Sequence, residues 1–102
     1  MSSTIFEKKD STLHVWPEGR LDTATSPVFE KEVRAQLDGV QHILMDFEHL
    51  EYISSGGLRA LLTIEKLIEE QNGDMRLFHV NENIMEIFDL VGFTDVVTVV
   101  PD

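Results

Sequence analysis

The chain has 102 residues, of which 42% are hydrophobic, and this length and composition fit one folded domain, predicted to span residues 1–102. Eight basic residues stand against nineteen acidic ones, for a net charge of −11. Such a surface repels phosphate backbones and anionic lipids, so binding to nucleic acid or a membrane is not expected. The absence of cysteine excludes a disulfide framework and a thiol nucleophile. Neither a signal peptide nor a membrane-spanning stretch is recognisable, so the cytoplasm is the expected location.

The first part of the chain has the alternating pattern of short strands. Residues 4–8 and 12–16 are predicted to form two strands, with Asp10-Ser11 as the turn between them. A turn this short favours an antiparallel pair. Gly19-Arg20-Leu21-Asp22 is expected to be a loop.

A helix and a buried strand are predicted next. Ser26 has the character of an N-cap, and Pro27 suits the first helical position. Gly39 is expected to end this helix. Residues 42–47 form an apolar run typical of a central strand that is covered on both sides.

The same alternation continues through the middle of the chain. Residues 48–55 are expected to form a loop, followed by a helix with one wide apolar side. Asn72-Gly73 is predicted to stop that helix. Residues 75–80 then have the pattern of another strand.

The C-terminal part supplies the last two elements. Either Asn81 or Asn83 is expected to cap a third helix, and Gly92 to end it. Residues 96–100 are predicted to form the final strand. The order β-β-α-β-α-β-α-β indicates an α/β domain with a mixed, mostly parallel sheet of about five strands and covering helices.

The segment Tyr52-Ile53-Ser54-Ser55-Gly56-Gly57-Leu58-Arg59 is the strongest candidate for a functional site, because it joins a strand to a helix start. A helix N-terminus offers free N–H groups and a positive dipole end to a phosphate. A phosphoserine here would add about −1.5 to −2 charges. Gly56 and Gly57 would let a partner approach the serine hydroxyls. The same residues also suit a plain helix cap, so local chemistry alone leaves both interpretations open.

The segment Leu50-Glu51-Tyr52-Ile53-Ser54-Ser55-Gly56-Gly57-Leu58 resembles the signature of the anti-sigma-factor antagonists, the STAS domain family. Its usual form is an apolar pair followed by Asp-Ser-Ser/Thr-Gly-Leu. Ser55 falls on the phosphoacceptor serine, Ser54 on the Asp and Gly56 on the second hydroxyl residue, which makes Ser54 a competing acceptor. Gly19-Arg20-Leu21-Asp22 is similar to a second family motif, and the order of elements matches from about residue 4 to residue 100.

This resemblance implies a regulatory cycle. The unphosphorylated domain would bind an anti-sigma factor that is a GHKL-type serine kinase, and so release the sigma factor. The kinase would use ATP to phosphorylate Ser55 and expel the domain, and a PP2C-type phosphatase would reset it. The domain would need no cofactor or metal and would not itself be an enzyme.

Two charged residues are candidates for partner binding alongside Ser54, Gly56 and Gly57. Arg59 follows Ser55 at i+4, so both can face the same side of a helix. Its side chain would pair with a phosphate or a partner's acidic group, or lie in solvent. Asp22 would contact the partner, order the loop beside Ser55, or bond to its own backbone.

Two other functions remain open from the sequence. The first is a STAS scaffold without a switch, in a stressosome-like or transporter-associated complex. The second is a small enzyme or phosphotransfer protein that uses Asp46 or a histidine. No acidic pair follows the first strand and no triad residues cluster in the sequence, which weighs against the second.

Overall fold

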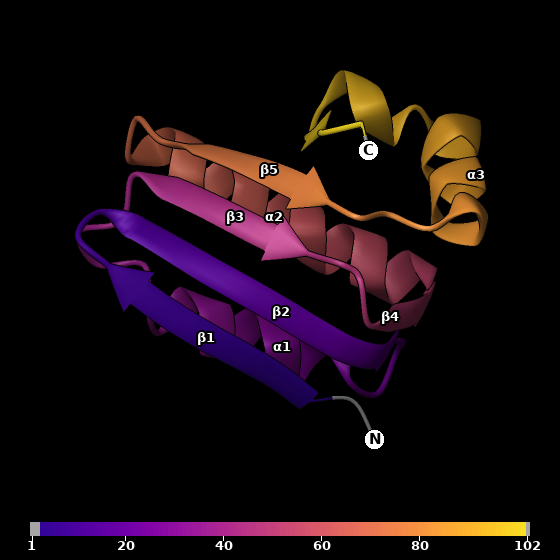
Figure 1. Cartoon of the computed structure of the whole chain (residues 1–102), viewed down its shortest axis with the longest axis horizontal. Helices are drawn as coiled ribbons and strands as arrows, with labels where there is room; N and C mark the ends of the chain where they lie inside the picture. The colour runs from indigo at the N-terminus through magenta and orange to yellow at the C-terminus, as the bar shows by residue number, and fades with distance from the viewer. Residues whose placement is uncertain (1–2, 102) are drawn as a thin grey trace.

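The computed structural model describes residues 3–101 (Figure 1). The predicted domain limits at residues 1 and 102 lie outside this range. The elements in chain order are β1 (Ser3–Lys9), β2 (Thr12–Leu21), α1 (Ser26–Arg34), β3 (His42–Asp46), β4 (Leu50–Ile53), α2 (Ser55–Glu70), β5 (Asp74–Phe78), α3 (Glu82–Val91), the 3₁₀ turn η1 (Phe93–Asp95) and β6 (Thr98–Val99).

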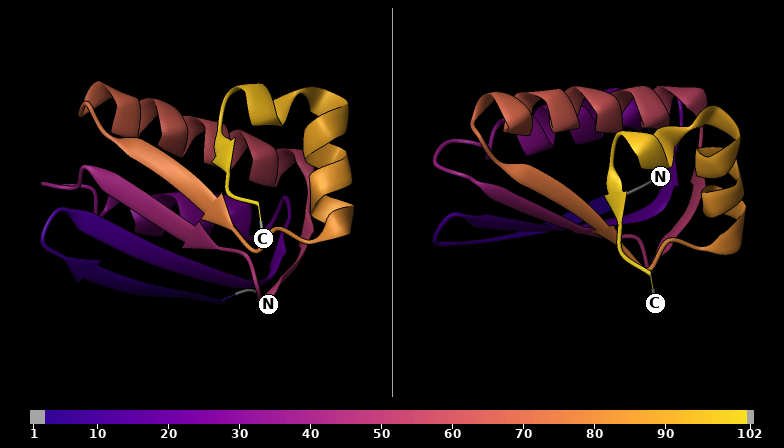
Figure 2. Two further views of the ribbon diagram at one scale, coloured as in Figure 1. Left: turned by 45° about the horizontal axis from the view of Figure 1, so that its top comes forward. Right: turned by 90° about the horizontal axis from the view of Figure 1, so that it is seen from above.

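The strands form one six-stranded sheet in the order β1-β2-β3-β5-β6, with β4 also beside β2. β1 and β2 are antiparallel, and every other pair is parallel. The predicted α/β class and mixed, mostly parallel sheet are therefore confirmed. α1 and α2 lie across one face of the sheet, whereas α3 stands at its end, next to β4 (Figure 2).

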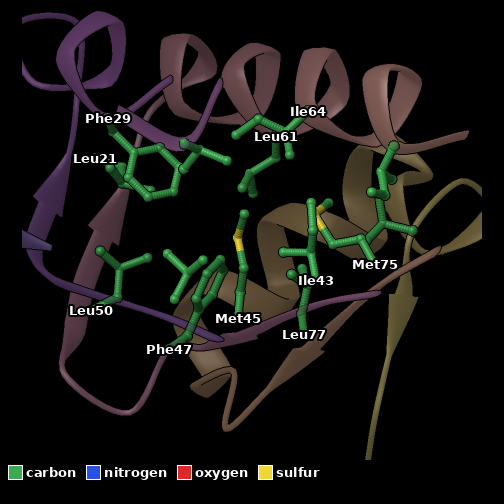
Figure 3. Close-up of a cluster of buried hydrophobic side chains, with 14 of the residues drawn as sticks. Leu21, Phe29, Ile43, Met45, Phe47, Leu50, Leu61, Ile64, Met75 and Leu77 are labelled. Carbon is green, nitrogen blue, oxygen red and sulfur yellow. The ribbon is translucent and has the colours of Figure 1, made fainter. Parts of the chain in front are cut away.

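The core lies between that face and the two covering helices (Figure 3). Alternate residues of each strand point inward because successive side chains of a strand leave on opposite sides. From β3 these are Ile43 and Met45, both fully buried. They meet Leu61 and Ile64, which α2 brings to its inner side one turn apart. This packing fixes the position of α2, and with it the position of the serines at its start.

The sheet has one strand more than predicted, because part of the expected loop 48–55 is β4. β4 is only four residues long and does not pair with the strand before it in the chain. It pairs with the far end of β2, where Gly19, Arg20 and Leu21 are strand residues rather than the expected loop. β2 is long enough to pair with β3 through residues 12–15 and with β4 through residues 19–21, and the β2–β4 pairing has a register shift between Gly19 and Arg20.

The predicted limits of α1 are wrong at both ends. Thr25, not Ser26, is the N-cap, and Ser26 is buried inside the first turn. The chain before the helix is already held by a hydrogen bond from the Ser26 amide to the Asp22 carbonyl, 2.9 Å long. The helix ends at Arg34, and Gly39 instead occupies a separate turn with φ of 76°.

The final strand, predicted over residues 96–100, is shortened to β6 (Thr98–Val99), because the amides of Val96 and Val97 bond to the Phe93 carbonyl instead. Several other limits agree with the sequence prediction. Asp10-Ser11 forms the turn of the β1–β2 hairpin. Asn81 caps α3 by accepting a hydrogen bond from the Ile84 amide, 2.9 Å long, and Gly92 ends α3 in a left-handed conformation. Within residues 3–101, no helix combines the length and apolarity needed to cross a bilayer.

Candidate functional site at the start of α2

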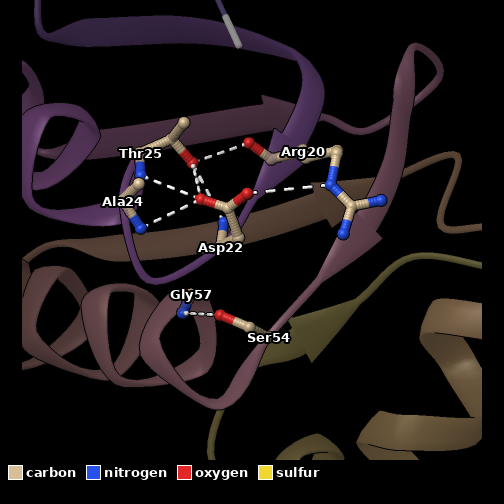
Figure 4. Close-up of polar contacts among 6 residues, drawn as sticks. All are labelled: Arg20, Asp22, Ala24, Thr25, Ser54 and Gly57. Carbon is tan, nitrogen blue, oxygen red and sulfur yellow. Dashed lines mark hydrogen bonds and ion pairs between the residues drawn. The ribbon is translucent and has the colours of Figure 1, made fainter. Parts of the chain in front are cut away.

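The first turn of α2 presents two serines in different environments. Ser54 is the N-cap, and its Oγ accepts a hydrogen bond from the Gly57 amide, 3.3 Å long (Figure 4). Ser55 is the first helical residue and is exposed. No group in the described part of the chain forms a hydrogen bond with its hydroxyl. One serine therefore completes the helix start, and the other offers a free hydroxyl to solvent.

The backbone of this turn leaves donors available. The Ser54 amide donates to the Leu21 carbonyl at 2.8 Å, and the Leu58 amide donates to the Ser54 carbonyl at 2.9 Å. The amides of Ser55 and Gly56 have no acceptor among residues 3–101. Free amides at a helix N-terminus favour a nearby anion. The turn can therefore stabilise negative charge placed on Ser55.

The loop after β2 is ordered by Asp22. Its Oδ1 accepts hydrogen bonds from the amides of Ala24 and Thr25, each 3.0 Å long (Figure 4). The Thr25 hydroxyl donates to the Arg20 carbonyl at 2.8 Å. The Thr25 amide, together with further hydrogen bonds and the Arg20 charge, lowers the pKa of Asp22. The prediction that Asp22 bonds to its own backbone is confirmed, and its contact with a partner stays a prediction.

The two sequence motifs meet at Gly56. A Cβ built on Gly56 would lie 3.5 Å from the Thr23 Cα and 3.9 Å from the Asp22 carbonyl oxygen, both ordinary contacts. The loop that contains Asp22 therefore lies directly against the first turn of α2. Gly56 remains half-buried, so part of its surface is open to a partner.

Gly57 has a different role from the predicted one. It is buried, and a Cβ at this position would lie 2.6 Å from the Ile53 Cγ1 and 2.7 Å from the Leu21 carbonyl oxygen. The missing side chain lets α2 approach β2 and β4 closely. The expectation that Gly57 makes room for a partner is therefore wrong, since the chain itself fills that room.

Arg59 is exposed, like Ser55 one turn before it. Its guanidinium makes no ion pair within residues 3–101. It borders a shallow groove between α1 and α2, which is lined by Thr23, Ser26, Pro27, Glu30, Gly56, Arg59 and Ala60. A free cation thus lies at the edge of the surface that includes Gly56.

A contact not predicted from the sequence links the two motifs on their other side. The guanidinium carbon of Arg20 lies 4.2 Å from the ring centroid of Tyr52, and the Arg20 Nε lies 3.7 Å from an Asp22 carboxylate oxygen. Arg20 therefore joins the end of β2 to β4 by a cation–π contact. The alternation of β4 places Ile53 in the core and leaves Tyr52 38% exposed.

The STAS family model matches residues 4–102. The chain belongs to the STAS domain family. A curated relative, the putative anti-sigma factor antagonist BtrV of Bordetella bronchiseptica, is 31% identical over 91 residues, covering 88% of this chain and 78% of BtrV.

Solved STAS structures share the fold. A putative anti-sigma factor antagonist from Thermotoga maritima aligns with a TM-score of 0.88 and 21% identity, covering 96% of this chain and 86% of the other. The unphosphorylated form of the anti-sigma factor antagonist SpoIIAA aligns with a TM-score of 0.78 and 16% identity, covering 98% and 89%. At these identities, the two structures establish the fold alone.

Asp46, the candidate for phosphotransfer, bonds to the loop that follows β3. Its Oδ1 accepts a hydrogen bond from the Glu48 amide at 2.9 Å and lies 3.0 Å from the His79 Nδ1. Among residues 3–101, no three histidine, aspartate or glutamate side chains come together as metal ligands.

Sequence reasoning missed one unusual residue, Glu65 of α2. Its side chain is only 8% exposed, and its Oε2 is buried without a hydrogen-bond partner among the described residues. Burial, followed by the negative charge of Glu69, a hydrogen bond with the Glu69 side chain and the negative charge of Asp74, raises the pKa of Glu65 to about 7. A signal was present, because position 65 lies four residues after Leu61 on the apolar side of the helix.

Proposed function

We propose that this STAS domain is an anti-sigma factor antagonist that binds a GHKL-type serine kinase through the start of α2 and is released when Ser55 is phosphorylated. The observation that carries the proposal is the exposed hydroxyl of Ser55, which has no hydrogen-bond partner among residues 3–101. The name of the Bordetella relative supports the antagonist role. The cycle takes place where the kinase has ATP, which is the cytoplasm.

The environment of the two serines supports Ser55 as the acceptor. Ser54 is half-buried, and its Oγ already accepts a hydrogen bond from the Gly57 amide. Phosphorylation of Ser54 by a kinase would therefore disrupt the N-cap of α2. Phosphorylation of Ser55 leaves that cap in place. The free amides of Ser55 and Gly56 would stabilise the phosphate that results.

The chemical step uses groups of the kinase. The Ser55 Oγ attacks the γ-phosphorus of ATP, the bond between that phosphorus and the β,γ-bridging oxygen breaks, and ADP leaves with the electron pair. The hydroxyl proton goes to a base on the kinase. A PP2C-type phosphatase reverses the state by directing water at the same phosphorus, which releases inorganic phosphate and restores the hydroxyl.

Release follows from charge and shape at the interface. The phosphate adds about −1.5 to −2 charges to a domain with a net charge of −11. It also fills space next to Gly56, where a partner would otherwise contact the backbone. A partner surface shaped for the bare hydroxyl would then face an unpaired, bulky dianion, which disfavours docking. The fold itself need not change.

Site mapping tests the proposal directly. The wild-type domain is used to capture its kinase from native cells, and the purified kinase is incubated with ATP and the domain. Mass spectrometry should find acid-stable phosphate on Ser55, and Ser55→Ala should take up none while still binding the kinase. Ser54→Ala is the matched control and should still be phosphorylated. Phosphate confined to Ser54 would overturn the choice of acceptor, and binding without phosphorylation would indicate a scaffold.

A further inference from the structure

Glu65 lies on α2, ten residues beyond Ser55, and its chemistry is unexplained by the packing of the domain. Its side chain is more than nine-tenths buried, and its Oε2 has no hydrogen-bond partner among the described residues. A buried polar atom normally has a hydrogen-bond partner, because moving it out of water without replacing its hydrogen bonds costs free energy. The carboxylate is therefore in a position to gain from a ligand that supplies a donor.

A groove lies beside the Glu65 side chain. It is about 380 Å³ in volume and is lined by Arg59, Leu62, Thr63, Glu65, Lys66, Glu69 and Val96. Two of its walls are apolar and exposed, with Leu62 at 37% and Val96 at 53%. The groove thus combines apolar sides with a buried carboxylate.

The charges that act most strongly on the carboxyl group of Glu65 are negative and favour a cation. Glu69 on the same helix and Asp74 at the start of β5 both add negative potential at Glu65. Arg59 and Lys66 line the groove, yet neither lies within ion-pair distance of Glu65. Val96, from the turn before β6, contributes no charge to the lining. A lysine or arginine side chain would fit, with its aliphatic stem on Leu62 and Val96 and its charged end on the carboxylate.

The groove lies within reach of a partner that docks on Ser55. Ten helical residues correspond to about 15 Å along the axis. A standard protein interface buries about 800 Å² on each partner, equal to a circle of about 16 Å radius. Arg59 borders both this groove and the one beside Gly56, so the two surfaces are continuous.

We propose that the groove beside Glu65 receives a lysine or arginine side chain of the anti-sigma factor, as a second anchor of the complex. The inference rests on the proposed function. The entering cation pairs with a carboxyl group whose Oε2 has no hydrogen-bond partner among the described residues and whose side chain otherwise interacts with Glu69, another acid. Since Glu65 is partly protonated near neutral pH, the pairing releases a proton, and affinity rises with pH.

The test uses purified wild-type domain, Glu65→Gln and the control Glu70→Gln with the purified kinase. Glu70 is an exposed acid on the same helix, so the control changes net charge equally. Dissociation constants are measured at pH 6, 7 and 8. With a pKa of about 7 for Glu65, wild-type affinity should fall about tenfold from pH 8 to pH 6. At pH 8, the dissociation constant of Glu65→Gln should be at least about tenfold higher than that of wild type, and it should not depend on pH in this way. Glu70→Gln should behave as wild type.

A direct readout is the pKa of Glu65 by carbon NMR in the free and kinase-bound domain. Its pKa should fall on binding, a shift that a purely structural role would not produce. An unchanged pKa, or full affinity of Glu65→Gln at every pH, overturns the inference.

Ser55→Glu in the same assay separates the two ideas. Loss of binding by Ser55→Glu with full binding by Glu65→Gln overturns only the Glu65 anchor. Full binding by Ser55→Glu overturns the switch itself, and a wild-type domain that binds no anti-sigma factor overturns both.

Discussion

The start and the middle of α2 differ in how their polar side chains are satisfied. At the start, Ser54 is hydrogen-bonded and Ser55 is exposed to water, so neither hydroxyl is unsatisfied. In the middle, the Glu65 carboxylate is buried and has an oxygen without a partner among the described residues. A modification site must be reached and altered without disturbing the fold. A recognition site can instead leave a group unsatisfied until a partner supplies what it lacks.

The largest effect on stability is expected from substitution of Gly57, one of the two adjacent glycines at the start of α2. Gly57→Ala should destabilise the domain by about 1–3 kcal/mol, because the new methyl group would collide with Ile53 and the Leu21 carbonyl. Gly56→Ala should be nearly neutral, since its methyl group meets only ordinary contacts. Urea denaturation of both variants measures the difference. Equal stabilities would show that α2 does not pack against β2 as described.

The middle of α2 should make stability depend on pH. The pKa of Glu65 in the folded state, about 7, lies above its ordinary value of 4.5. Its contribution to stability is therefore fully present below pH 4.5 and is lost as the pH rises through 7. We expect a loss on the order of 1–2 kcal/mol between pH 5 and pH 8, after allowance for solvent screening.

Glu65→Gln should remove this part of the pH dependence, whereas Glu70→Gln should retain it. Urea unfolding of the three proteins at pH 5, 6, 7 and 8 gives the comparison. If the free energy of unfolding of Glu65→Gln changed with pH in parallel with that of wild type, the Glu65 carboxylate would not be desolvated.

The two serines should differ in their effect on stability. Ser54→Ala removes the N-cap of α2 and should lower the free energy of unfolding by about 1 kcal/mol. Ser55→Ala removes an exposed hydroxyl and should change it by less than about 0.5 kcal/mol. Thermal unfolding of both variants tests the assignment, which a larger loss for Ser55→Ala would contradict.

The smallest effect is expected in the loop beside the helix start. The lowered pKa of Asp22 means that its stabilising contribution is present above its ordinary value of 3.8 and is lost as the pH falls through the folded-state pKa. Asp22→Asn keeps an acceptor for the Ala24 and Thr25 amides but removes the charge. It should be slightly less stable than wild type at pH 7 and equal to it in acid. A difference that persists in acid would point to a changed loop geometry.

The sequence predicted the elements whose local pattern and tertiary environment agree. The apolar stripe of α2, the hairpin turn at Asp10-Ser11 and an asparagine cap of α3, expected at Asn81 or Asn83 and found at Asn81, all depend on residues close in the chain. β4 was missed because four residues carry little periodicity. Their partner is the end of β2 from Gly19 to Leu21, which follows Pro17, and proline and glycine are typical of a strand end.

The candidate site was predicted only where it depends on residues close together in the chain. The position of Ser55 at a helix start follows from local chemistry and the family motif, and the structure agrees. The role of Gly57 could not be predicted from the sequence, because it depends on contact with the Leu21 carbonyl of β2, which is distant in the chain. Glu65 was likewise missed, since a charged residue on the apolar side of a helix shows its burial only once the sheet is in place.

The affinity of the purified anti-sigma factor for the domain before and after stoichiometric phosphorylation tests the account most directly. We predict that phosphate on Ser55 weakens the complex at least about a hundredfold, while the circular dichroism spectrum and unfolding midpoint stay close to those of the unmodified domain. Equal affinities of the two forms, or a phosphorylated domain that has lost its fold, would contradict it.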